Sequence, residues 1–552
     1  MMKDSTLTIA GLTITLPRGA DRPVAVQDFN LELHPGKVTC LIGESGSGKS
    51  LVARSILGLL PERVAISSGS ILFEGADLTR ATPAHMRAIR GAGIAMIFQE
   101  PMTALNPLQT IGRQITEVLR IHTALGRKAR RSQAETLLES VHLPDPKRLM
   151  ATYPHQISGG QRQRAMIAMA LALDPKLLIA DEPTTALDVT TQAQILRLIA
   201  ELQRRRGTAV LFITHDFGVV ADIADDVAVL QKGQLVESGS AQTILTAPRH
   251  PYTQALIAAV PKLQPPDAKP QNGDSPLVLQ AVGLQKTYAT QSFFRGRATL
   301  ALNNVSFELR RGETLGLVGE SGSGKSTLAR AVTRLLDVDA GEIRISGQDI
   351  AHFDRSRLRS HRRRIQMIFQ DPYASLDPRQ RIGDLIAEGP VIQGVPPAQA
   401  RAQANDLLML VGLDPKAAAR FPHEFSGGQR QRIGIARALA LQPDILVADE
   451  PVSALDVSVQ AQVLTLLADI KARLHLSMLF VTHDLRVALQ VCDRIAVMRQ
   501  GEIVEIAPAR AIFTAPQHPY TRALFAAVPG AMWAGVKASR DASGSSEQVV
   551  SQ

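Results

Sequence analysis

Short apolar runs alternate along the chain with longer stretches in which apolar and polar residues mix. Residues 37–42, 177–180 and 209–213 form such runs, and their apolar character predicts strands that are buried on both faces. Residues 49–60 carry apolar positions at helical spacing and predict a helix soon after the first run. This alternation of strand, loop and helix predicts an α/β fold built on a mainly parallel sheet.

The pattern is present twice in the sequence. The segment 43–50 returns unchanged at 319–326, and the segment 158–164 returns unchanged at 426–432. Such self-similarity predicts two tandem copies of one domain, joined by a proline-rich connection. We therefore predict a first domain over residues 1–261, an extended linker over 262–276, a second domain over 277–529 and a disordered tail over 530–552.

The composition is that of a folded protein too long for one ordinary core. Its 552 residues are 45% hydrophobic and 20% charged, which suits two large domains or several smaller ones. The net charge of +10 and the pI of about 9.8 fit anionic partners such as nucleotides, phospholipid surfaces or nucleic acid, without choosing among them. Basic runs at 127–131, 204–206 and 362–364 fall within or beside helical patterns, which favours solvated helix faces over a binding patch.

Cysteine usage and hydropathy limit the possible sites further. Cys40 and Cys492 each lie in a short apolar segment, so we expect buried thiols in a reducing compartment. Neither a disulfide framework nor a zinc or iron–sulfur cluster is expected from two cysteines. No run reaches the roughly 18 apolar residues that a membrane-spanning helix needs, and residues 1–6 lead into a strand pattern rather than a signal peptide. A role at a membrane would therefore come through partners.

The first repeated segment has the pattern of a phosphate-binding loop. Each copy follows an apolar strand and opens a helix, the context in which G-x-x-x-x-G-K-[ST] turns backbone N–H groups toward phosphates. A glycine-serine turn with an exposed lysine is the alternative, and two copies in this context make it the weaker one. We expect Lys49 and Lys325 to reach the β- and γ-phosphates, and Ser50 and Ser326 to ligate Mg²⁺. The predicted nucleotide contacts are Gly43, Glu44, Ser45, Gly46, Ser47, Gly48, Lys49, Ser50 and Leu51, and Gly319, Glu320, Ser321, Gly322, Ser323, Gly324, Lys325, Ser326 and Thr327.

Hydrolysis also needs a carboxylate for the metal and a group that orients water. An Asp-Glu pair ends the apolar strand 177–180 in the first copy and the strand 445–448 in the second. Alone, such a pair usually marks a turn, but here it lies downstream of a phosphate loop in both copies. We expect Asp181 and Asp449 to support Mg²⁺, and Glu182 and Glu450 to polarise the attacking water.

The second repeated segment resembles the signature motif of the ATP-binding-cassette (ABC) ATPases. Residues 157–161 and 425–429 match it, with Ile157 and Phe425 where leucine is usual. In physical terms, each copy consists of a serine N-cap and two glycines at the start of an amphipathic helix, at 161–173 in the first half and 429–441 in the second. The N-terminus of this helix offers a second binding place for an anion. The residues that would contact nucleotide here are Ser158, Gly159, Gly160, Gln161, Ser426, Gly427, Gly428 and Gln429.

Further elements of that family follow in the family's order. Gln99 and Gln370 match the glutamine that in the family joins the Mg²⁺ and water site to a helical subdomain, which touches the membrane partner. His215 and His483 each end a strand and resemble the switch histidine at the γ-phosphate, while residues 185–188 and 453–456 resemble the D-loop. The resemblance implies a P-loop NTPase fold with a helical subdomain in each half.

Family geometry also implies that the halves form a head-to-tail sandwich, in which each ATP lies between one P-loop and the other half's signature. ATP binding would close the sandwich and hydrolysis would reopen it. One site would then contain Lys49, Asp181, Glu182 and His215 with Ser426 and Gly428, and the other Lys325, Asp449, Glu450 and His483 with Ser158 and Gly160.

The two sites are predicted to differ where adenine stacks. The family usually has an aromatic residue near the start of each half, and Tyr288 supplies it in the second copy. The matching position of the first copy is Leu16. Since stacking of a base on an aromatic ring is worth about 1–3 kcal/mol in nucleic-acid sites, we expect weaker adenine binding at the first site.

The ends of the two halves identify a branch of the family. Residues 247–261 and 515–529 resemble the C-terminal extension of the dipeptide, oligopeptide and nickel importer ATPases, fused here as in some glutathione and microcin C importers. By itself, each would be a proline-started amphipathic helix that packs on its own domain. The resemblance implies an ATP- and Mg²⁺-dependent ATPase, peripheral at the cytoplasmic face of the bacterial inner membrane. It would drive uptake of a peptide-like solute through two integral membrane permease subunits and a separate extracytoplasmic solute-binding protein.

The alternative is a soluble tandem ABC ATPase that acts on ribosomes or nucleic acid. A ribosomal factor should carry a long charged arm between its halves, whereas residues 262–276 are few and rich in proline. A repair ATPase with zinc modules needs more than two cysteines, and a chromosome protein needs long heptad repeats between P-loop and signature. We therefore expect an importer subunit without nucleic acid, while the solute itself stays open among peptides, glutathione, peptide antibiotics and nickel chelates.

Overall fold

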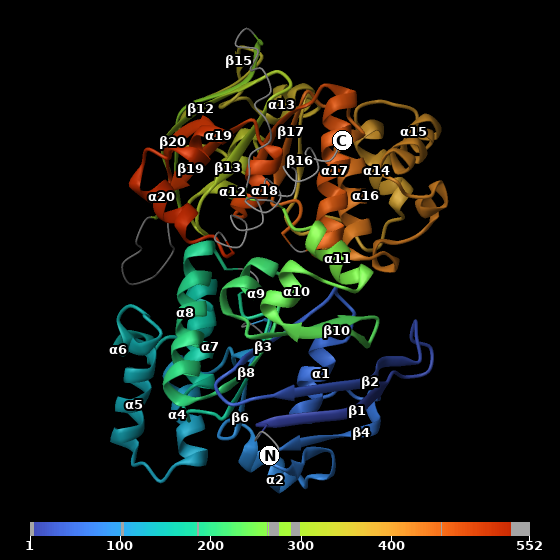
Figure 1. The fold of residues 1–552 in the computed structure, drawn as a ribbon. Helices are drawn as coiled ribbons and strands as arrows, with labels where there is room; N and C mark the ends of the chain where they lie inside the picture. The colour runs from blue at the N-terminus through green and yellow to red at the C-terminus, as the bar shows by residue number, and fades with distance from the viewer. Residues whose placement is uncertain are drawn as a thin grey trace, which may run out of the picture. The chain divides into compact units, whose positions relative to one another are not determined.

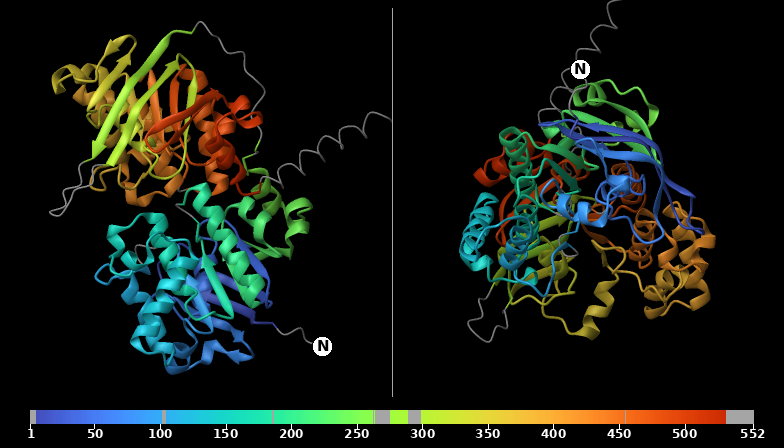
Figure 2. Two further views of the ribbon diagram at one scale, coloured as in Figure 1. Left: turned by 90° about the vertical axis from the view of Figure 1, so that its left-hand side faces the viewer. Right: turned by 90° about the horizontal axis from the view of Figure 1, so that it is seen from below.

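The computed structural model describes residues 5–100, 104–184, 187–261, 263, 275–288, 299–453 and 455–530 (Figures 1 and 2). The chain divides into two compact units, Met1–Ala259 with Pro529–Gln552, and Val260–Val528. Apart from residues 263, 275 and 276, the predicted linker lies outside the described residues, as does the predicted tail beyond Gly530. Among the described helices, none is long and apolar enough to cross a membrane.

A six-stranded sheet forms the centre of the first unit. Its strands β3, β7 and β8 are buried along their whole length, as their continuous apolar sequences predict. Five strands are parallel and β10 joins β9 antiparallel at one edge. The order is β10 (Gln234–Ser240), β9 (Asp226–Gln231), β3 (Val38–Ile42), β8 (Ala209–Ile213), β7 (Leu177–Asp181) and β6 (Ile94–Ile97).

A second, antiparallel sheet packs on the same core. Its strands alternate buried and more exposed positions, the pattern of a sheet with one wet face. One hydrophobic cluster joins this sheet to the helix α1 (Lys49–Ile56) and to the parallel sheet, through residues such as Ile9, Val52 and Ile179. The order is β2 (Val24–Leu33), β1 (Leu7–Thr15), β4 (Ala65–Phe73) and β5 (Ala76–Asp77).

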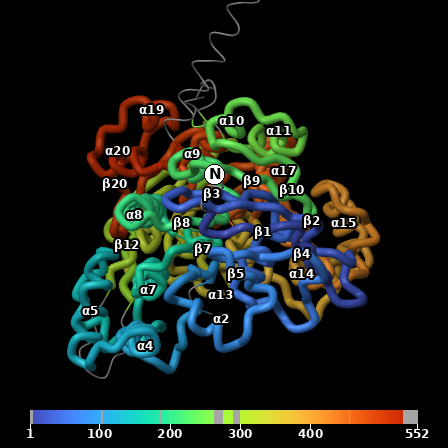
Figure 3. The backbone as a smooth tube through the Cα atoms, turned by 60° about the horizontal axis from the view of Figure 1, so that its bottom comes forward, coloured from blue at the N-terminus to red at the C-terminus, as the bar shows by residue number. Residues whose placement is uncertain are grey.

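A group of helices forms a subdomain away from the antiparallel sheet. In Figures 1 and 3, α4, α5 and α7 lie side by side, on a different part of the unit from β1, β2 and β4. The helices of the first unit after α1 are α2 (Pro83–Ile89), α4 (Ile111–His122), α5 (Arg127–Ser140), α6 (Pro146–Leu149), α7 (Gly159–Ala170), α8 (Val189–Arg206), α9 (Phe217–Ile223), α10 (Ala241–Thr246) and α11 (Pro251–Ala258).

The second unit repeats this architecture. Its parallel sheet has the order β16 (Ile365–Ile368), β17 (Ile445–Asp449), β18 (Ser477–Val481), β13 (Thr314–Val318), β19 (Arg494–Arg499) and β20 (Glu502–Pro508). Its antiparallel sheet has the order β12 (Thr299–Arg310), β11 (Leu277–Tyr288), β14 (Ala340–Ile345) and β15 (Gln348–Asp349). The helices are α12 (Lys325–Val332), α13 (Arg355–Arg362), α14 (Ile382–Ile392), α15 (Pro397–Leu410), α16 (Gly427–Leu439), α17 (Val457–Leu474), α18 (Leu485–Val491), α19 (Ala509–Thr514) and α20 (Pro519–Ala526). The predicted α/β class, with a mainly parallel core and a helical subdomain in each half, is confirmed.

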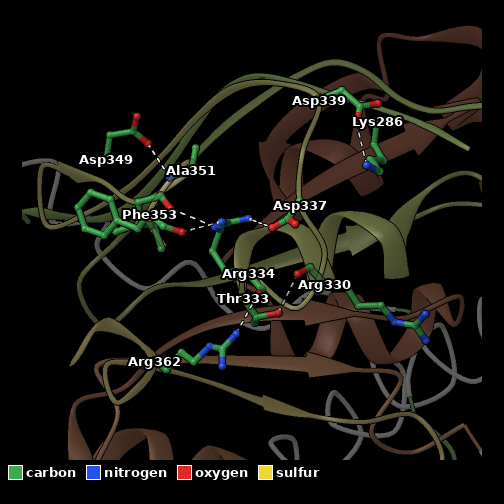
Figure 4. A network of polar contacts seen from close by, with 11 residues as sticks. Lys286, Arg330, Thr333, Arg334, Asp337, Asp339, Asp349, Ala351, Phe353 and Arg362 are labelled. Carbon is green, nitrogen blue, oxygen red and sulfur yellow. Dashed lines mark hydrogen bonds and ion pairs between the residues drawn. The ribbon is translucent and has the colours of Figure 1, made fainter. Parts of the chain in front are cut away.

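The helix that follows the first P-loop ends earlier than its apolar pattern suggests. We predicted a helix over 49–60, but α1 ends at Ile56 because Gly58 turns the chain with a φ of 61°. In the second unit Arg334 ends α12 with a φ of 53°, and its buried guanidinium donates to the Ile350 and Phe353 carbonyls at 3.0 and 3.2 Å (Figure 4). The hydrogen bonds of that guanidinium offset the backbone strain of a left-handed arginine.

Candidate nucleotide-binding sites

The P-loop of each unit connects a buried strand to a helix, and its first glycine cannot be replaced without a clash. Gly43 has a φ of 152°, and a Cβ there would lie 2.2 Å from the Leu230 carbonyl oxygen. Gly319 has the same conformation, and its Cβ would lie 2.2 Å from the Met498 carbonyl oxygen. The close approach of two backbone segments therefore sets the course of the loop.

The P-loop lysines are buried and bend back over the loop. Lys49 Nζ donates to the carbonyl oxygens of Gly43 and Glu44 at 2.7 and 2.9 Å. Lys325 makes the equivalent bonds in the second unit, both at 2.8 Å. Each loop also holds a buried serine hydroxyl, of Ser47 or Ser323, with no hydrogen-bond partner among the described residues. An ammonium group beside an unpaired hydroxyl, at a helix start, fits a bound phosphate group.

A hydroxyl and a carboxylate meet beside each P-loop, where Mg²⁺ was predicted. Ser50 Oγ donates to Asp181 Oδ1 at 3.1 Å, and Ser326 Oγ donates to Asp449 Oδ1 at the same distance. Burial raises the pKa of both aspartates, although the serine hydroxyl partly opposes this effect. A cation at this position would favour the charged carboxylate. These oxygen donors suit Mg²⁺, which takes few protein ligands and completes its shell with phosphate oxygens and water.

The glutamate that follows each of these aspartates joins two other predicted residues. Gln99 Nε2 donates to Glu182 Oε2 at 3.0 Å, and His215 Nδ1 lies 3.4 Å from Glu182 Oε1. The backbone of Glu182 is in the left-handed region, with a φ of 46°. Its N–H donates to the Ile213 carbonyl at 3.0 Å. Such strain in a non-glycine residue costs on the order of 1–3 kcal/mol, and it persists here because the strand end holds the peptide in place.

The second unit repeats this arrangement around Glu450. Gln370 Nε2 donates to Glu450 Oε2 at 2.9 Å, and His483 Nδ1 lies 3.3 Å from the same oxygen. Glu450 also has a positive φ, of 47°. Burial favours the protonated acid, but the hydrogen bond and charge of His483, with the charge of Lys325, outweigh it and lower the pKa of Glu450. Burial likewise disfavours the charged His483, yet Glu450 outweighs it and raises the pKa of the imidazole.

The Glu450–His483 pair should give stability a defined pH dependence. Below the ordinary glutamate pKa of 4.5, the glutamate contribution disappears as the pH falls through the lowered native pKa. The histidine contribution is fully present below the ordinary pKa of 6.5 and disappears as the pH rises through the raised native pKa. We therefore expect the melting temperature to fall in the His483→Gln variant, with the largest loss between pH 4.5 and 6.5.

Differential scanning calorimetry across this range and into alkaline solution measures the effect. The exposed His352 supplies a matched control, since His352→Gln should leave the pH dependence unchanged. A loss in His483→Gln that is equal at every pH would contradict the interaction.

The signature segments form capped helix starts, as predicted. Ser158 Oγ accepts the Gln161 N–H at 3.3 Å, and the Gln161 side chain accepts the Ser158 N–H at 3.2 Å. Ser426 and Gln429 form the same capping box in the second unit. The helices begin at Gly159 and Gly427, two residues before the predicted starts, and end at Ala170 and Leu439, also earlier than predicted. The signature glycines therefore lie inside the first helical turn, where N–H groups are available.

Comparison with known proteins decides the family. The chain matches the family described as "ABC transporter" over residues 26–185 and 302–453. It belongs to the ABC transporter family. It also matches "Oligopeptide/dipeptide transporter, C-terminal region" over residues 236–291 and 504–541, which agrees with the branch inferred from the two extensions. The chain is accordingly an ATPase with two nucleotide-binding domains.

Three relatives cover nearly the whole ABC ATPase. This chain is 47% identical to the glutathione import ATP-binding protein GsiA of Shigella boydii, and the alignment covers 95% of this chain and 89% of that protein. The GsiA of Salmonella typhimurium is 48% identical with the same coverage. The peptidoglycan transport ATP-binding protein YejF of Agrobacterium fabrum is 48% identical over 94% of this chain and 96% of that protein.

The D-loop positions of the ABC ATPase are described only in part, since Thr185, Ala186 and Ala454 lie outside the described residues. Asp188 caps the start of α8, because its carboxylate accepts the Thr191 N–H at 2.8 Å.

Gln163 is a buried residue that was not among the predicted site residues. Its Nε2 donates to the Pro183 carbonyl at 2.6 Å and so joins the signature helix to the segment that follows β7. The identical position of Gln163 and Gln431 in the two repeats is the signal that could have indicated a role.

The predicted adenine-binding positions differ in the structure as well as in the sequence. Tyr288 is the last residue of β11 and 42% of its surface is exposed, whereas Leu16 packs against the hydrophobic core.

Arg22 was not predicted from the sequence as a site residue. Its guanidinium donates to the Gly46 carbonyl in the P-loop of the first unit. This arginine places a positive charge beside that loop, where an anion would bind.

Removal of the Tyr288 ring should weaken one of the two sites. Because stacking is worth about 1–3 kcal/mol, we expect Tyr288→Leu to lower the ATP affinity of its site by roughly five- to 150-fold. Isothermal titration with a non-hydrolysable ATP analogue should give two unequal affinities for the parent chain and more nearly equal ones for the variant. The exposed Tyr153, replaced by leucine, is the control. Equal affinities in the parent, or no change on Tyr288→Leu, would count against this role.

Proposed function

We propose that this chain is the ATP-hydrolysing subunit of an importer for peptide-like solutes. The observation that carries the proposal is the presence, in one chain, of two sets of phosphate, metal and water-orienting groups, each followed by the oligopeptide-transporter extension. ATP binding and hydrolysis would change the relation between the two domains, and permease subunits would convert that change into solute movement.

Each residue set has a definite role in this proposal. The P-loop lysines bind the phosphates, while Ser50 and Asp181 hold Mg²⁺ in the first unit, as Ser326 and Asp449 do in the second. Mg²⁺ neutralises phosphate charge when it is bound. The glutamate that follows the aspartate orients and polarises water, and the neighbouring glutamine and histidine fix the direction of its carboxylate. The hydrogen bonds that join these side chains support these roles.

The pairing of sites across the two units is part of the proposal. Each signature helix offers its first-turn N–H groups and an exposed serine to an anion, which supports a role beyond capping. We assign Ser426 and Gly428 to the ATP held by Lys49, and Ser158 and Gly160 to the ATP held by Lys325. A Cβ at the buried Gly428 would lie 2.3 Å from Val459 Cγ1 and would force that side chain to shift, whereas a Cβ at Gly160 would lie 3.6 Å from Thr191 Cγ2.

The partners follow from the relatives and from the extension. GsiA is named as a glutathione import protein and YejF as a peptidoglycan transport protein, and both names indicate transport of molecules that contain peptide bonds. We infer two integral membrane permease subunits and a separate extracytoplasmic solute-binding protein. The chain would bind the permeases at the cytoplasmic face of the bacterial inner membrane. A ribosome- or DNA-directed ATPase is not favoured, because the near full-length relatives carry transport names.

Affinity purification of the full chain from gently solubilised cells tests this proposal. We expect membrane permeases to co-purify stoichiometrically, and their genes to lie beside the gene for this chain. Stable association with ribosomes or DNA, without permeases, would overturn the proposal.

A further inference from the structure

A tyrosine from the C-terminal extension contacts the P-loop backbone in each unit. The Glu44 N–H donates to Tyr252 Oη at 3.1 Å, across 208 positions of sequence. In the second unit the Glu320 N–H donates to Tyr520 Oη at 3.2 Å, across 200 positions. The P-loop segment and the start of the extension are nearly identical in the two copies of the domain, and both copies make the same contact.

The tyrosine is held in place by a chain of hydrogen bonds that begins in the sheet. Glu237 on β10 accepts the N–H groups of Arg249 and His250 at 2.7 and 3.2 Å. His250 Nδ1 then caps α11 by accepting the Tyr252 N–H at 3.2 Å. The cap fixes the backbone of the first helical turn, where Tyr252 lies, and so fixes the point from which its side chain extends.

The second unit contains the same chain of bonds. Glu505 on β20 accepts the N–H groups of Gln517 and His518 at 2.8 and 3.0 Å. His518 Nδ1 accepts the Tyr520 N–H at 3.1 Å. The Arg499 guanidinium also lies over the Tyr520 ring, 4.9 Å from its centroid, and the ring is buried. The cap therefore sets the backbone position of the tyrosine in both units, and in the second unit burial and Arg499 also hold its ring.

The hydroxyl and the P-loop lysine bind the two ends of one peptide group. The Gly43 carbonyl and the Glu44 N–H belong to the same planar unit. Lys49 Nζ holds its oxygen at 2.7 Å, and Tyr252 Oη holds its N–H. Rotation of this peptide would move the carbonyl that orients the ammonium group, so the tyrosine bond restricts the position from which the lysine meets a phosphate.

We propose that Tyr252 and Tyr520 are positioning residues of the ATP sites, which act through the P-loop peptide and make each extension helix a structural part of its nucleotide site. The proposal rests on the function proposed above, in which the P-loops bind ATP. The extension then contributes to nucleotide affinity, besides whatever it contributes to recognition of partners.

Replacement of both tyrosines by phenylalanine in the full chain tests the proposal, since only the two hydroxyls are lost. A hydrogen bond of this kind corresponds to about a two- to tenfold change in affinity, so we expect the Kd for a fluorescent ATP analogue to rise by that factor. The KM for ATP should rise similarly and kcat should change less. The melting temperature without nucleotide should fall by only a few degrees, since each lost hydrogen bond costs about 1 kcal/mol of stability. The exposed Tyr153, replaced by phenylalanine, is the matched control.

The other results would overturn the proposal. An unchanged Kd would show that the hydroxyls do not position the loop. A loss of affinity that disappears when parent and variant are compared at the same distance below their melting temperatures would show a purely structural role. The single variants Tyr252→Phe and Tyr520→Phe provide the same measurement if the double variant does not fold. Lys49→Ala with Lys325→Ala distinguishes the two levels of inference, because retained ATP binding in that variant would refute the P-loop assignment itself.

Discussion

Replacement of Glu182 and Glu450 together by glutamine should stop ATP turnover and leave ATP binding intact. Glutamine preserves the size of the side chain and its contact with Gln99 or Gln370, which the glutamates make at 3.0 and 2.9 Å. It cannot accept a proton from water, so we expect kcat to fall by about 10²- to 10⁴-fold. Phosphate release measures turnover, and equilibrium binding of a fluorescent ATP analogue measures affinity.

A control separates this effect from a general loss of charge. Glu62 is exposed and has no role in either site, so Glu62→Gln should hydrolyse ATP at the parent rate. Hydrolysis at the parent rate by the double variant would show that another group orients the water. Loss of ATP binding together with turnover would instead show that the two glutamates hold the nucleotide.

Pairs of substitutions should reveal which P-loop works with which signature. In the non-hydrolysing Glu182→Gln, Glu450→Gln background, we expect each chain to retain two ATP molecules after rapid filtration. Addition of Lys49→Ala and Ser426→Arg damages one composite site twice, and one ATP should remain. Addition of Lys49→Ala and Ser158→Arg damages both composite sites, and ATP retention should be lost. The reason is that substitutions within one site are not additive, whereas those in separate sites are.

The reverse pattern would identify self-contained sites, each built within one unit. Loss of the serine caps should cost about 1 kcal/mol of helix stability in either position, so both arginine variants carry the same structural penalty. Equal melting temperatures for the two combinations would confirm that the comparison is matched.

The local parts of the fold could be predicted from the sequence. The strands at 38–42, 177–181 and 209–213 lie where continuous apolar runs placed them, because a strand buried on both faces needs apolar residues throughout. The serine N-caps at Ser158 and Ser426 could also be predicted, since a cap depends on residues close together in the sequence. Because the motifs occur twice in the sequence, two domains of the same fold could be predicted.

Features that depend on distant contacts were not predictable. In the antiparallel sheet of the first unit, β1 pairs with β4 across the P-loop and α1, so no short sequence pattern predicts that pairing. The end of α1 depends on Gly58 and on Arg90, which donates to the Leu57 carbonyl from another helix end. Tyr252 was visible as part of the extension, but its contact with Glu44 required the folded chain.

The site was predictable as a set of residues rather than as a network. Family motifs named Gln99, Glu182 and His215 separately, and the structure brings their side chains within hydrogen-bonding or ion-pair distance. The left-handed conformation of Glu182, with a φ of 46°, has no sequence signal, because only the neighbouring strand enforces it.

Uptake by intact cells tests ATP-driven import most directly. Cells that lack this gene would receive the parent chain, Glu62→Gln, or the Glu182→Gln, Glu450→Gln double variant, each at matched abundance, and would be supplied with labelled glutathione or short peptides. We predict that the parent and Glu62→Gln restore uptake of at least one of these solutes and that the double variant restores none. Equal uptake with the double variant, or no dependence of any uptake on this gene, would contradict a role in ATP-driven import of peptide-like solutes.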